Sequence, residues 1–189
     1  YEEAADSKKV VALLEKLRKC LGELPVLFTF RSSREGGEAA LSDGAYQSLN
    51  EAAIASGFVD CVDVELFSGD AVVKAVVAAA HSNHVKVIAS NHDFEKTPAA
   101  EELLARLQKM EALGADIPKI AVMPQSSKDV LTLLTVTESW KETGKAPVIT
   151  MSMAGEGLIS RLCGEIFGSA VTFGAAGKSS APGQIDAEE

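Results

Sequence analysis

The most constraining feature of this 189-residue sequence is a regular alternation of helical and strand-like segments. Segments with apolar residues at helical spacing alternate with short apolar runs that are rich in β-branched and aromatic residues. This alternation is typical of parallel βαβ units, in which helices cover both faces of the sheet. The sequence therefore predicts an α/β fold, organised as a single domain over residues 1–189.

Six strands are expected, each preceded by a helix. The expected strands are residues 26–30, 60–67, 85–90, 119–123, 148–153 and 170–173. The expected helices are residues 10–21, 43–56, 70–83, 98–113, 128–143 and 157–167. Glycine at position 22 marks the end of the first helix, and Thr97 with Pro98 marks the start of the fourth.

The spacing of the strands favours one particular α/β architecture. The strands begin about 29 residues apart, close to the period of a (βα)8 barrel. No glycine-rich fingerprint joins the first strand to a helix, as a dinucleotide-binding sheet would require. We therefore expect an incomplete (βα)8 barrel of the TIM type with about six parallel strands and surrounding helices.

Charge and cysteine content limit the partners and the location. The chain has 18 basic and 27 acidic residues, a net charge of -9, so we expect no nucleic-acid partner. No long apolar run or signal sequence is present, so we expect no membrane partner. Cys20, Cys61 and Cys163 are expected to be small buried side chains in a cytoplasmic protein. The polar residues 178–189 form an expected flexible tail.

The candidate catalytic groups follow the expected strands, where parallel α/β proteins gather reactive side chains. In the fourth strand, the two-residue period puts Lys119, Ala121 and Met123 on one face. An amine among apolar neighbours stays uncharged more readily and can form a Schiff base. The alternative is a lysine at the start of the strand that reaches solvent.

Other polar residues near the strand ends leave two interpretations open. His92 follows the third strand and is a candidate acid and base, which Glu35 or Asp93 could orient. It could also be structural, and His81 and His84 are weaker candidates. Arg161 could bind a carboxylate through two hydrogen bonds, or be an exposed helical arginine.

Three more features have structural alternatives. Asp63 and Glu65 lie two residues apart and could act as a carboxylate pair, or form ion pairs inside the barrel. The loop residues Arg34, Glu35 and Glu38 could simply be a solvated surface. Glycine-containing loops at 155–157 and 174–177 resemble phosphate sites only weakly, and ordinary turns would explain them.

Together, these segments resemble type I 3-dehydroquinate dehydratases, lyases of the shikimate pathway. The motifs that match in order and spacing are Phe28-Thr-Phe-Arg-Ser32, Glu35-Gly-Gly-Glu38, Asp63-Val-Glu-Leu66, Ser90-Asn-His-Asp93, Lys96-Thr-Pro98, Gly114-Ala-Asp-Ile-Pro-Lys-Ile120, Met151-Ser-Met153, Ile159-Ser-Arg161 and Ser180-Ala-Pro-Gly-Gln184. The match covers nearly the whole chain.

The resemblance implies a role for each matching residue. Lys119 would form the imine with 3-dehydroquinate, His92 would be the acid and base, and Glu35 would orient His92. Substrate-binding positions and apolar walls would be provided by Arg31, Arg161, Ser180, Gln184, Met151, Met153 and Phe173. The resemblance implies no metal or organic cofactor, and the family commonly forms dimers, so a homodimer is a further expectation.

The sequence also departs from the family pattern. The family's first two βα units and final helix have no counterpart, including a Glu and an Arg that contact substrate. We therefore expect impaired turnover for this polypeptide, because water would reach the lysine. Two other functions stay open: another Schiff-base barrel lyase of the class I aldolase type, and a non-catalytic assembly module with a vestigial site.

Overall fold

The computed structural model describes residues 6–177 and 181–187, and its strands form one five-stranded sheet in the order β1-β2-β3-β4-β5. Pairing is parallel between β1 and β2, between β2 and β3, and between β4 and β5. The strands are β1 (Leu27–Thr29), β2 (Cys61–Glu65), β3 (Lys86–Asp93), β4 (Ile117–Val122) and β5 (Ile149–Ser152). The predicted α/β class is confirmed.

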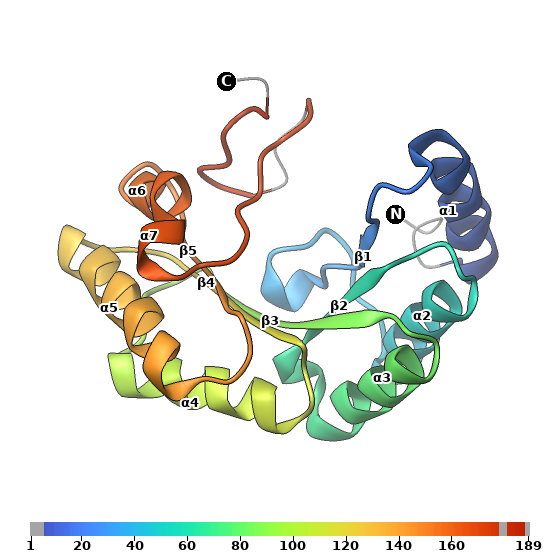
Figure 1. Ribbon diagram of the computed structural model, residues 1–189, viewed down its shortest axis with the longest axis horizontal. Helices are drawn as coiled ribbons and strands as arrows, with labels where there is room; N and C mark the ends of the chain where they lie inside the picture. The colour runs from blue at the N-terminus through green and yellow to red at the C-terminus, as the bar shows by residue number, and fades with distance from the viewer. Residues whose placement is uncertain (1–5, 178–180, 188–189) are drawn as a thin grey trace. The chain divides into compact units, whose positions relative to one another are not determined.

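Helices alternate with these strands along the chain, as Figure 1 shows. They are α1 (Ser7–Leu21), α2 (Asp43–Ala55), α3 (Asp70–Ser82), α4 (Ala100–Ala112), α5 (Ser127–Thr143), α6 (Leu158–Leu162) and α7 (Gly164–Phe167). Two single 3-10 turns, η2 (Ser33–Glu35) and η3 (Leu66–Ser68), follow β1 and β2. None of the helices within the described residues is long and apolar enough to cross a membrane.

The chain divides into two compact units, the first of which comprises the described residues up to Ser90 together with 112–116. In this unit α2 packs against α1 and α3 (Figure 1). Its core includes the fully buried side chains of Tyr46, Leu49, Ile54 and Val62. The apolar face of α1 is only partly covered, because Leu14 is buried whereas Leu13, Leu17 and Leu21 are exposed.

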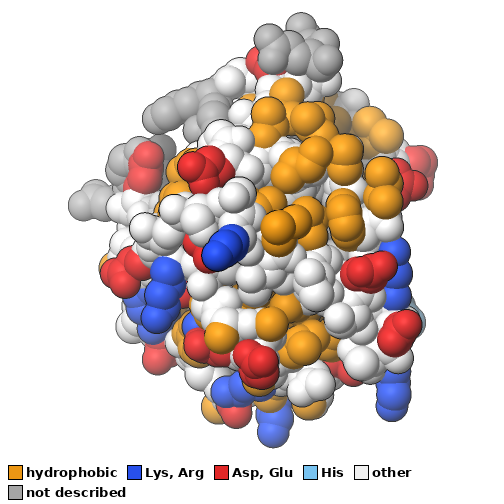
Figure 2. Space-filling view, turned by 90° about the vertical axis from the view of Figure 1, so that its left-hand side faces the viewer, with side chains coloured by type: hydrophobic (Ala, Val, Ile, Leu, Met, Phe, Trp, Pro, Cys, Tyr) orange, Lys and Arg blue, Asp and Glu red, His pale blue; other side chains and the backbone are white. Residues whose placement is uncertain are grey.

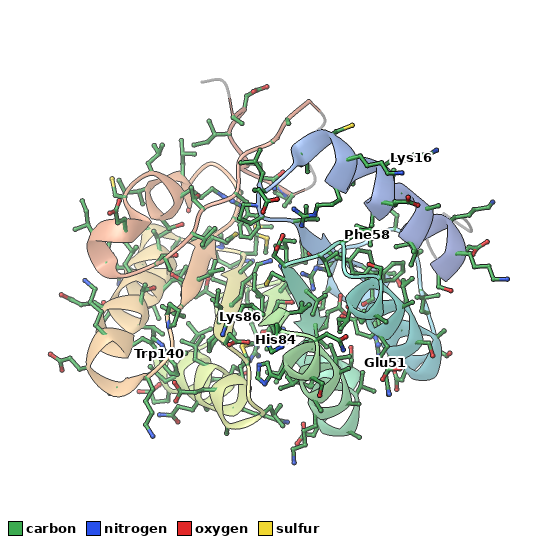
Figure 3. The ribbon with its side chains drawn as sticks, turned by 45° about the vertical axis from the view of Figure 1, so that its right-hand side comes forward. Lys16, Glu51, Phe58, His84, Lys86 and Trp140 are labelled. Carbon is green, nitrogen blue, oxygen red and sulfur yellow. The ribbon has the colours of Figure 1, made fainter. Side chains whose placement is uncertain are left out.

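The second unit comprises residues 91–111 and the described residues from Ile117 onward. Here α5 packs against β5 and α7, and a capping box between Ser126 and Asp129 begins α5. Trp140 of α5 is buried and donates a hydrogen bond to the carbonyl of Ala146 (2.9 Å; Figure 3). Hydrophobic side chains gather on the face seen in Figure 2, the side of the molecule on which α5, α6 and α7 lie. The exposed ones on α6 and α7 are Ile159, Leu162 and Ile166.

Several predicted boundaries are wrong. Residues 170–173 form no strand, because the segment is held only by an isolated bridge between Ser169 and Val148 and its next residues are exposed. The fourth helix begins at Ala100 rather than at Pro98, since the Thr97 hydroxyl donates to the Met123 carbonyl (3.0 Å) instead of capping the helix.

Two further predictions need correction. The segment 157–167 contains two short helices separated at Cys163 rather than one helix. Cys20 is exposed, whereas the sequence predicted a buried side chain, because it lies on the solvent side of α1. Cys61 and Cys163 are half-buried, and burial raises the pKa of the Cys61 thiol to about 11.

Candidate active site

The first unit surrounds the guanidinium of Arg31 with carboxylates. Arg31 Nη2 donates to Asp63 Oδ1 (2.8 Å), and Nη1 donates to Glu65 Oε1 (3.1 Å). A third carboxylate, Glu35, has Oε2 at 3.5 Å from Arg31 Nη1. The Ser90 hydroxyl accepts from Arg31 (2.9 Å) and donates to Asp63 (2.6 Å). Asp63 and Glu65 are therefore ion-paired, as one of the two predicted alternatives required.

Strand alternation explains why these carboxylates meet. Asp63 and Glu65 lie two residues apart in β2, so both side chains project to one face of the sheet. Both are almost completely buried, and a buried carboxylate requires a charged or hydrogen-bonded partner. Glu65 also accepts from the Ser32 backbone amide (2.7 Å) and hydroxyl (2.6 Å), which ties the end of β1 to β2.

A tight turn after β1 buries Glu35. The amide of Gly37 donates to the Ser32 carbonyl (2.8 Å), which closes the loop around η2. A Cβ atom at Gly37 would lie 1.8 Å from the Arg31 carbonyl oxygen, so only glycine fits. Glu35 is buried, whereas Arg34 and Glu38 are exposed, so the solvated-surface alternative holds for Arg34 and Glu38 alone.

The electrostatics of this cluster favour a permanently charged arginine. Burial by itself would lower the pKa of Arg31, but the charges of Asp63, Glu65 and Glu35 together raise it. The Arg31 guanidinium donates to Asp63, Glu65 and Ser90, which all belong to the same unit.

In the second unit, Lys119 lies on an apolar face of the sheet. Residues 119 and 121 share one face of β4, and the register pairs Lys119 with Ile149 and Ala121 with Met151. Lys119 is only 6% exposed, and its Nζ lies 4.7 Å from the centroid of the Phe173 ring. The alternative in which this lysine reaches solvent is therefore wrong.

Arg161 of α6 is a buried cation of a different kind from Arg31. It is 5% exposed, and its Nη2 donates to the carbonyl of Pro182 (3.3 Å). Its Nε and Nη1 have no hydrogen-bond partner within the described residues. Burial lowers its pKa. The alternative of an exposed helical arginine is wrong, and the unused N–H groups suit a carboxylate ligand.

His92 occupies the penultimate position of β3 and is partly exposed. Its ring stacks on that of Phe94, with centroids 6.4 Å apart and an interplanar angle of 24°. The neighbouring residues Asn91 and Asp93 both face Arg106 of α4, whose Nη1 donates to Asn91 Oδ1 (2.6 Å) and lies 3.7 Å from Asp93 Oδ2.

The other predicted histidines lie at the opposite end of β3. His81 Nε2 is 2.9 Å from Asp116 Oδ2, and the Lys86 ammonium is 2.8 Å from Asp116 Oδ1. Figure 3 labels His84 and Lys86 in this region. The hydrogen bond between His81 and Asp116 supports the structural interpretation of His81.

The remaining predicted residues are distributed over β5 and the C-terminal segment. Met151 and Met153 are buried, and Phe173 is half-buried beside Lys119. Gln184 is half-buried, and its side-chain oxygen accepts from the Ala181 amide (3.2 Å). Ser180 lies outside the described residues, as do parts of the predicted tail, whose flexibility stays a prediction.

The glycine-containing loop after β5 has a structural role. A Cβ at Gly157 would lie 2.2 Å from the Ser152 carbonyl oxygen, so the chain passes too closely for any other residue. This close approach supports the ordinary-turn alternative over a phosphate site.

Sequence reasoning did not single out Arg106 or Ser32. Arg106 looks like an ordinary polar residue of an amphipathic helix, and its contact with Asn91 arises only when α4 packs beside β3. Ser32 ends the first motif that resembles the family, but no role was assigned to it from the sequence.

Comparisons with known proteins show the family to which the chain belongs. A family model described as type I 3-dehydroquinase matches residues 1–189. A 3-dehydroquinate dehydratase of Listeria monocytogenes serotype 4b (strain CLIP80459) is 59% identical over 189 residues, which cover 100% of this chain and 75% of the relative. One from Escherichia coli O139:H28 is 58% identical over 190 residues, with the same coverage of both chains.

Solved structures give the same result. The crystal structure of a type I 3-dehydroquinate dehydratase from Clostridium difficile, with covalently modified comenic acid, has a TM-score of 0.94 and 54% identity. The alignment covers 100% of this chain and 74% of that one. The chain belongs to the type I 3-dehydroquinase family.

Proposed function

We propose that this chain dehydrates 3-dehydroquinate to 3-dehydroshikimate through an imine on Lys119. The observation that carries the proposal is the position of Lys119, which is 6% exposed on a sheet face shared with Met151 and lies beside the Phe173 ring. In this position the amine adjoins apolar side chains, where it can attack a bound ketone away from bulk water.

The first half of the proposed reaction takes place at Lys119. Its amine attacks the C3 carbonyl carbon, and loss of the carbonyl oxygen as water leaves a protonated imine. His92 then removes a proton from C2, and the electron pair of that C–H bond moves toward the imine nitrogen to form an enamine. The imine thus makes the C2 hydrogen acidic enough for an imidazole to remove.

The second half eliminates water and releases the product. The enamine electrons form the C1–C2 double bond, the C1–O bond breaks, and protonated His92 gives its proton to the departing hydroxyl. Hydrolysis of the imine frees 3-dehydroshikimate and restores the Lys119 amine. No electrons enter or leave in the overall reaction, so the steps require no oxidant or reductant.

The other residues are proposed to bind and orient. Arg161 binds the substrate carboxylate, an assignment supported by its buried and partly unused guanidinium. The family resemblance assigns Glu35 to the orientation of His92, and Arg31, Ser180 and Gln184 to substrate binding. Met151, Met153 and Phe173 provide apolar walls.

Three properties of the protein stay predictions. A cytoplasmic location and a homodimer rest on composition and on the family resemblance, and light scattering tests the dimer. Impaired turnover is expected for this polypeptide, which spans 75% of the length of the Listeria relative. Comparison of its kcat with that of the longer relative tests that expectation.

Reductive trapping tests the imine directly. Borohydride added with 3-dehydroquinate should convert the imine to a stable amine, visible as an increase in intact mass that peptide mapping places on Lys119. Lys119→Ala should abolish the adduct and turnover, whereas the exposed Lys128→Ala variant should retain both. An unmodified wild-type mass at saturating substrate would overturn the proposal.

The same assay distinguishes the two alternative functions. An adduct with a phosphorylated aldol substrate, together with no response to 3-dehydroquinate, would favour a class I aldolase. A stable oligomer whose melting temperature responds to neither ligand would favour an assembly module.

A further inference from the structure

The end of β3 that carries His92 is contacted by a side chain of α4, on the residues before and after His92. Asn91, His92 and Asp93 are its last three residues, and side chains alternate between the two faces of a strand. Asn91 and Asp93 therefore project toward one face, and His92 projects toward the other. Arg106 contacts both residues that flank His92.

The contacts of Arg106 fix the orientation of its guanidinium relative to β3. One nitrogen, Nη1, donates to Asn91 Oδ1 at 2.6 Å and lies 3.7 Å from Asp93 Oδ2. The other terminal nitrogen, Nη2, pairs with Glu102, one helical turn earlier in α4. The planar guanidinium is thus oriented from its own helix and directed at the strand.

The other carboxylate oxygen of Asp93 accepts hydrogen bonds from the turn that follows β3. Its Oδ1 accepts from the amides of Glu95 (3.1 Å) and Lys96 (3.0 Å), and its carbonyl accepts from the Met123 amide (2.9 Å). The turn after β3 is therefore fixed, and Arg106 adds the restraint that comes from α4.

We propose that Arg106 is a positioning residue for the dehydration, which holds the imidazole of His92 in place by clamping Asn91 and Asp93. The inference rests on the proposed function, because it requires His92 to be the acid and base. A displacement of about 1 Å in a catalytic group can cost about 10²-fold in rate, so such a clamp has a measurable effect on turnover.

The central test replaces Arg106 and separates proton transfer from imine formation. Arg106→Met keeps an unbranched apolar side chain but removes the guanidinium, and with it the charge and the N–H groups. We expect kcat to fall about 10²-fold with little change in KM. Borohydride trapping on Lys119 should continue, and Arg106→Lys should recover part of the lost kcat because it restores one donor.

Two control variants show whether the effect is specific. The exposed Arg34→Met variant removes a cation that forms a surface ion pair with exposed Asp43, and it should leave kcat unchanged. Glu102→Gln weakens the orientation of Arg106 without removing its contacts to β3, so its loss of kcat should be smaller than that of Arg106→Met.

An NMR readout does not depend on activity. The His92 and Phe94 rings stack in the wild type, so nuclear Overhauser effects between them should weaken in Arg106→Met. Unchanged kcat and unchanged ring contacts in a folded Arg106→Met protein would overturn the proposal. So would a lower melting temperature with proportional losses of trapping and turnover, because that pattern indicates a purely structural role.

The outcomes also separate this proposal from the proposed function. Absence of wild-type trapping and turnover would refute the dehydratase assignment, and with it the catalytic role of Arg106. Normal wild-type chemistry with a fully active Arg106→Met variant would refute only the positioning role. If Arg106→Met does not fold, Asn91→Ala removes the opposite partner and should produce the same separation of kcat from trapping.

Discussion

Arg31 is half-buried and Arg161 is buried; both lie at predicted substrate-binding positions, but their surroundings are opposite. Arg31 has carboxylate oxygens of Asp63, Glu65 and Glu35 within 3.5 Å, and their charges raise its pKa against the effect of burial. Within the described residues, the Arg161 side chain donates to one acceptor, the Pro182 carbonyl, and burial lowers its pKa.

Arginines in these two kinds of surroundings contribute differently to folding and to ligand binding. A guanidinium surrounded by its own carboxylates supports the fold, and removal of one partner leaves the others buried and uncompensated. A buried guanidinium with unused N–H groups carries a desolvation cost that a ligand carboxylate can offset. The comparison therefore supports the proposal that Arg161 binds the substrate carboxylate, and it shows that the charge of Arg31 is balanced by carboxylates of its own unit.

The largest expected effect is on catalysis, at Arg161. Arg161→Met should lower kcat/KM by roughly 10²- to 10⁴-fold, because hydrogen bonds to charged groups contribute about 1.5–3 kcal/mol each. The free energy of unfolding should stay the same or increase, since the variant no longer buries an incompletely paired cation. Steady-state kinetics and urea unfolding measure the two quantities.

Arg161→Lys is the matched variant for that prediction. It keeps the charge but loses the planar pair of donors, so its kcat/KM should lie between those of the wild type and Arg161→Met. A large loss of stability with unchanged kcat/KM would reverse the comparison between the two arginines.

The next effect is on stability, at Arg31. Arg31→Leu should lower the free energy of unfolding by about 3–5 kcal/mol, because it leaves buried carboxylates without their cation. Neutralising those partners in the same background, with Asp63→Asn and Glu65→Gln, should restore part of the loss. Urea unfolding of the single and combined variants measures this coupling, and a loss of less than about 1 kcal/mol would contradict it.

The smallest expected effect concerns acid stability in the unit that contains Arg31. Burial would raise the pKa of Asp116, but hydrogen bonds from Lys86, His81 and the Val87 amide lower it below its ordinary value of 3.8. A lowered carboxyl pKa contributes stability above the unfolded value, and that contribution is lost as the pH falls through the folded pKa.

Asp116→Asn should therefore reduce the loss of stability below pH 3.8, by up to about 1 kcal/mol. Urea unfolding between about pH 5 and pH 2 measures the change. The exposed Asp43→Asn variant serves as the control. An identical pH dependence in the wild type and in Asp116→Asn would show that this carboxylate does not contribute.

Some parts of the fold and of the site could be predicted from the sequence, and others could not. The face of β4 that carries Lys119 and Ala121 follows from a two-residue period, and the structure pairs Ala121 on that face with Met151. The prediction of a strand at 170–173 is wrong. A strand needs a neighbouring strand to pair with, and the isolated bridge in this region is formed by Ser169.

Local patterns in the sequence determined the α/β class, the five strands that the described residues form and the sheet face of Lys119, because helix and strand periods are properties of neighbouring residues. Tertiary structure alone decided that Arg31 is surrounded by carboxylates, that Arg161 is buried with donors left unpaired by the described residues, and that Arg106 contacts the residues beside His92. Arg31 lies 32 residues from Asp63, and Arg106 lies 15 residues from Asn91. The physical reason is that charge pairing depends on distance in space, and packing of helices and strands brings such residues together.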